Sequence, residues 1–181
     1  MTRRERALPV EVRGALAGRA RDLAGVAHEV EALAQVDLRA DSAPASVGLP
    51  LEPNTWIANG DHEALWLGPD EWLIVGPPGT EDSISKDLER ALAGLPHSVV
   101  EVSAARAIFE VEPAVRRDLL PQGCGIDLHP RSWRDGMCAQ TLLARVPVIL
   151  QERETGTRIF VRPSFAKYLV NWLVHVAGVR P

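Results

Sequence analysis

The stretch that decides the fold is LWLGPDEWLIVGPPG, at residues 65–79. Apolar side chains alternate on both sides of the turn at residues 68–71, which is the pattern of a half-buried β-hairpin. The alternation predicts that Trp66 and Trp72 take part in cross-strand packing, with Asp70 holding the turn. Because neighbouring residues on a strand point to opposite faces, the two acidic residues of this turn do not form a catalytic pair.

Outward from this hairpin, turn residues divide the chain into short strands and a few helices. Asn59-Gly60 is a hairpin signal because both residues tolerate positive φ. The helix predicted at 81–93 begins with acidic residues, and its apolar residues share one face. Gly94 follows it as a C-cap. Strands are predicted at 34–39, 55–58, 63–67, 71–75, 98–103, 105–111, 138–152 (bent near Pro147) and 157–161, and helices at 81–93, between Pro113 and Pro121, and after Pro163 with Ser164 as N-cap.

The order of these elements from Glu71 to about Val146 is β-α-β-β-α-β. That order is typical of a ferredoxin-like, split βαβ lobe, in which two helices cover one face of an antiparallel sheet. The remaining strands and the last helix would form a second small antiparallel sheet-and-helix lobe. We therefore expect an α+β protein, with an N-terminal arm at 1–30 and a single two-lobed domain at 31–181.

The bulk composition describes an ordinary globular chain. Of its 181 residues 46% are hydrophobic, and the net charge of −4 provides no positive field for nucleic acid or anionic lipid. Arg3 and Arg4 are not followed by the apolar segment of an export signal, and no stretch is long enough to span a membrane. Cys124 and Cys138 lie far apart without a second cysteine pair, so we expect two reduced thiols in the cytoplasm.

A search for chemistry in the sequence finds no catalytic constellation. There is no Gly-x-Ser-x-Gly elbow, no Gly-x-Gly-x-x-Gly fingerprint and no P-loop. The GPPG run at 76–79 contains two prolines and lacks the backbone N–H groups that a phosphate cradle needs. We predict no catalytic, cofactor-binding or metal-binding residue in this chain, which favours an interaction or accessory domain. The histidines are isolated, without the spacing of metal ligands, at 28, 62, 97, 129 and 175.

Seven ordered segments resemble the gamma subunit of heterotetrameric sarcosine oxidase, and together they run through most of residues 33–174. The arm at 1–30 takes no part in the likeness. The segments are QVDLR at 35–39, PLEPNTW at 50–56, LWLGPDEWLIVGPPG at 65–79, VEVSAARAIFEV at 100–111, GCGIDLHPRSW at 123–133, CAQTLLARVPVIL at 138–150 and VRPSFAKYLVNWL at 161–173.

The resemblance implies a non-catalytic accessory subunit. Such an oxidase demethylates sarcosine oxidatively to glycine, with hydrogen peroxide and a one-carbon unit that is released as formaldehyde or passed to tetrahydrofolate. FAD, FMN, NAD and tetrahydrofolate are then expected on partner subunits, and this chain is expected to pack mainly on the alpha subunit of a complex that also holds beta and delta. The chain could equally be an accessory subunit of a related secondary-amine oxidase. This alternative stays open because the substrate would never touch this chain.

The family's fold is also similar to the folate-binding domain of glycine-cleavage aminomethyltransferase. The segment VEVSAARAIFEVEPAVRRDLL at 100–120 carries that likeness. Glu101 stands where that domain has an aspartate. The acidic hairpin that helps that domain to hold the pterin has no counterpart here, because the corresponding run at 146–150 is apolar. The resemblance thus implies a retained fold and a lost ligand site, and the alternative is a stand-alone folate-binding or one-carbon domain.

Three residues in polar loops are the candidates for a partner interface: Asn54, Trp56 and Trp133. An indole left in water at such a position would be costly, and each tryptophan could bury about 150–250 Å². The alternative is that each indole folds back over the edge of its own core. Sequence alone leaves the two interpretations open.

Overall fold

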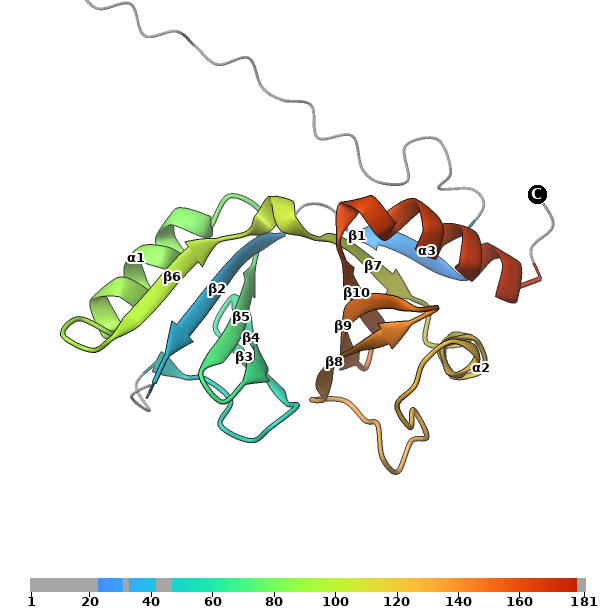
Figure 1. The fold of residues 1–181 in the computed structure, drawn as a ribbon, viewed down its shortest axis with the longest axis horizontal. Helices are drawn as coiled ribbons and strands as arrows, with labels where there is room; N and C mark the ends of the chain where they lie inside the picture. Colours follow the sequence, from blue (N-terminus) through green and yellow to red (C-terminus); the bar gives the residue numbers. More distant parts are fainter. Residues whose placement is uncertain (1–22, 31–32, 42–46, 179–181) are drawn as a thin grey trace, which may run out of the picture.

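The computed structural model describes residues 23–30, 33–41 and 47–178. Two five-stranded antiparallel sheets lie side by side, each with a helix on its outer face (Figure 1). In spatial order, the first sheet holds β1 (Ala27–Val30), β7 (Ala107–Val111), β10 (Gly156–Val161), β9 (Val146–Arg153) and β8 (Cys138–Leu143), and the second holds β3 (Trp56–Asn59), β4 (His62–Gly68), β5 (Glu71–Gly76), β2 (Ala34–Ala40) and β6 (His97–Glu101).

The β4–β5 hairpin is buried on both faces. Trp66 and Trp72 are cross-strand partners, as predicted, and they contact the core beneath α1 (Glu81–Ala91). Leu65 and Leu73 point the other way, into a second core that they share with Phe160 of the first sheet. The two-residue period of this segment therefore builds two cores at once, because one strand face packs on the helix and the other on the opposite sheet.

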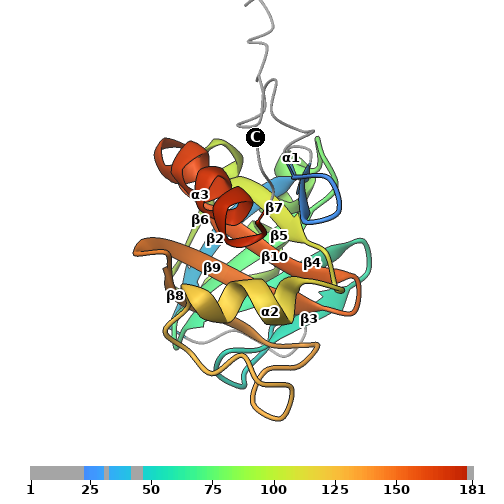
Figure 2. The ribbon, with the colours of Figure 1, turned by 90° about the vertical axis from the view of Figure 1, so that its right-hand side faces the viewer.

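The helices cover the outer faces. Leu169 and Leu173 of α3 (Pro163–Val176) lie in one core with Ile159 of β10, and a short helix, α2 (Arg116–Leu119), adds Leu119 to it. Figure 2 shows α3 and α2 on the outer side of the first sheet. The predicted α+β class with two lobes is confirmed.

The split βαβ prediction is correct for its first half and wrong for its second. Strands β5 and β6 both pair with β2, which lies between them, and α1 connects them. However, β7 and β8 belong to the other sheet, where β10 and β9 separate them. The chain crosses between the sheets at a 3-10 turn, Ser103–Ala105, which Gln35 anchors by accepting the Val102 N–H. Local patterns give the order of elements but not the sheet that each strand joins.

The long bent strand predicted at 138–152 is a hairpin of β8 and β9. Ala144 and Arg145 form its two-residue turn with φ of 50° and 68°, a left-handed conformation that the sequence did not signal because neither is glycine or asparagine. The predicted cap of α3 is also wrong. The helix begins at Pro163 after Arg162, and no side chain caps it, because proline already suits the first helical position.

The N-terminal boundary of the domain lies earlier than residue 31. Strand β1 pairs with β7 along its whole length, so the end of the predicted arm belongs to the first sheet. Residues 1–22 of that arm lie outside the described residues. Among the described helices, none is both long and apolar enough to cross a membrane.

Candidate functional site

The cysteines and the possible metal ligands are the first groups to examine for chemistry in the described residues. No group of three or more His, Cys, Asp or Glu side chains in residues 23–30, 33–41 and 47–178 could hold a metal ion. Burial raises the pKa of the Cys138 thiol to about 12, so this thiol is protonated and inert at neutral pH. Cys124 is half-buried and also unpaired with another cysteine.

Two loops that are far apart in sequence meet at the lower edge of the molecule in Figure 1. One precedes β3 and carries Asn54, and the other precedes β8. A β-bridge joins Thr55 to Met137, and the Cys138 N–H donates to the Asn54 carbonyl at 2.9 Å. Asn54 has a left-handed φ of 60°, which asparagine tolerates better than most residues. The two loops therefore form one continuous surface that joins the two lobes.

Glu152, near the end of β9, hydrogen-bonds to residues from both chain segments at this junction. Its carboxylate accepts the indole N–H of Trp133 at 2.8 Å and pairs with the Arg116 guanidinium at 3.2 Å, and Thr157 donates its hydroxyl to the same carboxylate. The backbone carbonyl of Glu152 accepts the indole N–H of Trp56, also at 2.8 Å. Only 4% of Glu152 is exposed, so this charge is stabilised by three donors rather than by water.

The structure brings Trp56 and Trp133 together with Asn54, although the three side chains lie in different environments. Trp133 is 6% exposed and belongs to its own hydrophobic core, as the second of the two sequence interpretations has it. Trp56 is half-buried, with the Arg153 guanidinium 5.5 Å from its ring centre. Asn54 is exposed. Contact of these residues with a partner stays a prediction.

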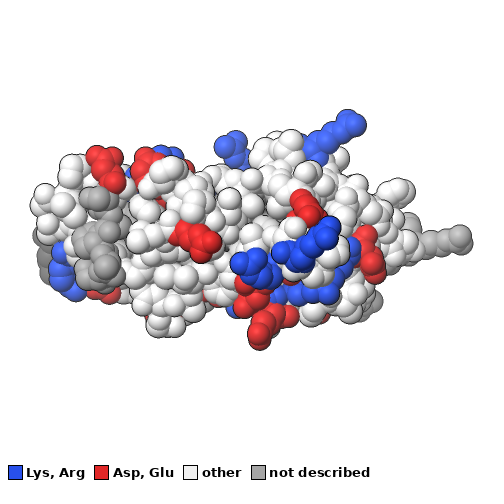
Figure 3. All heavy atoms as spheres, turned by 90° about the horizontal axis from the view of Figure 1, so that it is seen from below, with Lys and Arg blue, Asp and Glu red and all other residues white. Residues whose placement is uncertain are grey.

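The structure also exposes apolar and basic side chains that sequence analysis did not single out. Leu51 is 72% exposed and Ile57 is 37% exposed, although both flank the Asn54 turn. Arg117, Arg131 and Arg134 are exposed, and so are the neighbouring Asp118, Asp127 and Asp135. Seen from below, basic and acidic side chains lie close together on one half of the molecule (Figure 3). Sequence could not single them out, because an exposed leucine or arginine is unremarkable until its neighbours are known.

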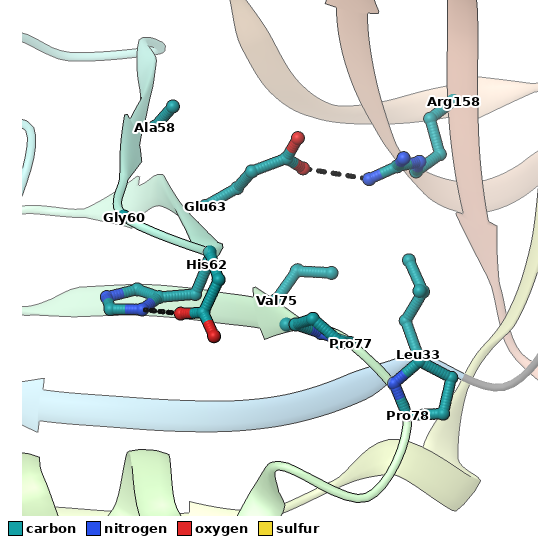
Figure 4. Close-up of a pocket in the computed structure, with 11 residues that line it drawn as sticks. Leu33, Ala58, Gly60, His62, Glu63, Val75, Pro77, Pro78 and Arg158 are labelled. Carbon is teal, nitrogen blue, oxygen red and sulfur yellow. Dashed lines mark hydrogen bonds and ion pairs between the residues drawn. The ribbon is translucent and has the colours of Figure 1, made fainter.

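A cavity of about 370 Å³ opens between the two sheets. Figure 4 shows Glu63 of β4 and Arg158 of β10 meeting across it, above Leu33 and Val75. The Glu63 carboxylate pairs with Arg158 at 2.8 Å and with Arg153, and the Gln151 amide donates to it at 3.0 Å.

Both carboxylate oxygens of Glu63 are therefore occupied by the protein's own groups. Burial lowers the pKa of Arg158, against the raising effect of Glu63. The cluster acts as a tie between the sheets rather than as a free ligand-binding group. Sequence analysis missed the tie because its two strands are far apart in the chain and no local pattern pairs them.

Comparison with known proteins decides the family. The model of the sarcosine oxidase gamma subunit family matches residues 37–178. The chain therefore belongs to that family. It is 35% identical over 133 residues to the sarcosine oxidase gamma subunit of Corynebacterium sp. strain P-1, which is 71% of this chain and 64% of that protein. The gamma subunit of Arthrobacter sp. is 33% identical over 135 residues, covering 74% and 66%. The chain thus spans about two thirds of the length of these gamma subunits.

Solved structures agree with this membership. A chain of the heterotetrameric sarcosine oxidase from Corynebacterium sp. U-96, in complex with pyrrole 2-carboxylate, matches 92% of this gamma-family chain and 94% of its own length, with a TM-score of 0.80 and 28% identity. Glycine cleavage system aminomethyltransferase T from Bartonella henselae matches 89% of this chain and 50% of its own, with a TM-score of 0.60 and 12% identity. The second likeness shows the shared fold, as predicted.

Proposed function

We propose that this chain is the non-catalytic accessory subunit, gamma, of a heterotetrameric sarcosine oxidase. The observation that carries the proposal is the likeness over 92% of the chain to a chain of a solved heterotetrameric sarcosine oxidase. The described residues support it, since the buried Glu152 and the half-buried Glu63 are held by the protein's own groups and burial raises the pKa of the Cys138 thiol.

The complete complex would demethylate sarcosine oxidatively, giving glycine, hydrogen peroxide and a one-carbon unit passed to tetrahydrofolate. FAD, FMN, NAD and tetrahydrofolate would be held by partner subunits, with alpha as the main contact of this chain and beta and delta completing the assembly. The complex would work in the cytoplasm, where Cys124 and Cys138 stay reduced.

Co-expression tests this proposal directly. Full-length chain produced together with the alpha, beta and delta subunits should elute with them as one stoichiometric complex that oxidises sarcosine. The control omits this chain and should give less assembled oxidase. If active oxidase forms without the chain, and the chain elutes alone, the proposal is wrong.

A second candidate is a stand-alone folate-binding or one-carbon domain, which the fold shared with aminomethyltransferase favours. Titration calorimetry with tetrahydrofolate separates the two functions. The accessory role predicts no binding to the isolated chain at micromolar concentrations, and micromolar affinity would support the folate function instead.

A further inference from the structure

We propose that His97 forms a pH-dependent bridge between the end of α1 and the start of β6, called here the His97 bridge. Its ring is positively charged in the folded protein and is held by the Leu95 carbonyl and the Glu89 carboxylate. Loss of that charge as the pH rises releases this corner of the second sheet. The inference goes beyond the proposed accessory function, because it concerns contacts within this chain alone.

Both ring nitrogens of His97 face hydrogen-bond acceptors. Nδ1 lies 2.7 Å from the Leu95 carbonyl oxygen, and Nε2 lies 2.9 Å from a carboxylate oxygen of Glu89. A carbonyl and an ionised carboxylate can only accept, and surface carboxyl groups are ionised at neutral pH. A neutral imidazole has one donor nitrogen and one acceptor nitrogen, so it would turn a lone pair toward one of these oxygens. Only the imidazolium, with two N–H donors, satisfies both contacts.

The His97 bridge connects three consecutive parts of the chain. Glu89 lies in the last turn of α1, Leu95 lies in the connecting loop, and His97 is the first residue of β6. Strand β6 is at the edge of its sheet and pairs with β2. The positive ring also lies beside the C-terminal end of a helix, where the helix dipole favours a cation. The bridge therefore fastens the end of the helix to a strand that has a neighbouring strand on one side.

On β2, an uncharged residue lies opposite His97. This residue is Ala40, which is buried in the core beneath α1. Because neighbouring residues on a strand point to opposite faces, Arg39 lies on the other face of the sheet, where it pairs with Glu71 at 2.8 Å. Asp41, beyond the end of β2, is exposed to water.

On α1, Glu89 is the charged group that contacts the ring. Its neighbour Arg90 pairs with Asp87 at 2.8 Å, and Lys86 is exposed. The hydrogen bond to the Leu95 carbonyl raises the pKa of His97 most, followed by the hydrogen bond to Glu89, whereas burial lowers it. The net result is a pKa above the ordinary value of 6.5. This direction agrees with the charged ring that the two hydrogen bonds require.

The direction of the pH dependence follows from tighter proton binding in the folded state. A histidine with a raised pKa stabilises the fold fully below its unfolded pKa of about 6.5. That stabilisation is lost as the pH rises through the higher pKa of the folded state. The His97 bridge is thus closed at about pH 6 and open at about pH 9, where the end of α1 and the start of β6 gain freedom.

NMR titration of the full-length chain tests the charge of the ring. The His97 ring signals should titrate at higher pH in the folded chain than in the urea-unfolded chain. Glu89→Gln should lower the folded-state pKa, because the amide keeps the shape of the side chain and removes its charge. Asp87→Asn is the matched control, since it removes a carboxylate of the same helix that pairs with Arg90 instead, and it should leave the titration of His97 unchanged. A folded-state pKa of His97 at or below the unfolded value overturns the inference.

Urea unfolding at two pH values tests whether the bridge holds the fold. The midpoint of Glu89→Gln should lie below that of wild type at about pH 6, and should reach or exceed it at about pH 9. At the higher pH the ring is neutral, and a carboxylate near the C-terminal end of a helix is unfavourable. An equal offset of Glu89→Gln from wild type at both pH values contradicts the bridge. No oxidase subunit is present in these measurements, so their outcome is separate from that of the co-expression experiment.

Discussion

The indole N–H of Trp133 donates to the buried carboxylate of Glu152 at 2.8 Å. A tryptophan from a surface loop is thus fixed to the end of a core strand, and the same carboxylate also pairs with Arg116. The bond explains why a bulky indole in a polar loop is 6% exposed without a partner chain. It also makes the loop depend on one charged group, and this dependence can be measured.

Glu152→Gln should lower the free energy of unfolding by about 3–5 kcal/mol. The amide removes the negative charge beneath Arg116 and brings an N–H₂ group among three donors that need an acceptor. Urea unfolding of the isolated chain, followed by tryptophan fluorescence, measures the change. Glu154→Gln is the matched control, because Glu154 is exposed, and we expect its effect to stay within about 0.5 kcal/mol. Equal stability of the two variants would mean that Glu152 does not hold the loop.

Glu63→Ala should be similarly costly, because it leaves Arg153 and Arg158 without their shared carboxylate between the sheets. Removing one partner of a fully buried ion pair typically costs about 3–5 kcal/mol, and because Glu63 and Arg153 are half-buried we expect the loss to lie near the lower end of that range. The control is Asp87→Ala, which breaks an exposed pair with Arg90 and should cost less than about 1 kcal/mol. Urea midpoints at fixed pH give both values. A loss below about 1 kcal/mol for Glu63→Ala would show that water in the adjoining cavity hydrates both arginines.

The two cysteines should react with a thiol reagent in a fixed order. The pKa of Cys138, raised to about 12 by burial, keeps its thiolate fraction negligible at pH 8, whereas Cys124 is half-buried at a loop. We expect one equivalent of Ellman's reagent to react with the native protein and two with the unfolded protein. The Cys124→Ser variant should abolish the native reaction, and rapid labelling of Cys138 in that variant would contradict its burial.

Local patterns in the sequence were sufficient to predict most helices and strands. They could not predict which residues far apart in the chain come into contact. The Trp66–Trp72 pairing was predictable because its strands are joined by one short turn with proline and glycine. The Glu63–Arg158 pair and the meeting of two loops at Glu152 join strands whose neighbours are set by the whole topology. Sequence placed Asn54, Trp56 and Trp133 in two loops, but it could not tell that these loops meet or that Trp133 is buried in its own core. Their contact with a partner stays a prediction.

The hairpin between β8 and β9 gives the last prediction, since sequence analysis took it for a single bent strand. Arg145 is exposed and has a φ of 68°, a conformation that costs a non-glycine residue roughly 1–2 kcal/mol. Arg145→Gly should relieve this strain and raise the free energy of unfolding by up to about 1 kcal/mol, after the entropy that glycine loses on folding. Lys86→Gly is the control, because Lys86 is an exposed residue within α1, where glycine lowers stability by roughly 1 kcal/mol. Thermal unfolding of both variants measures the difference, and a destabilised Arg145→Gly protein would mean that the arginine side chain contributes more than its backbone strain costs.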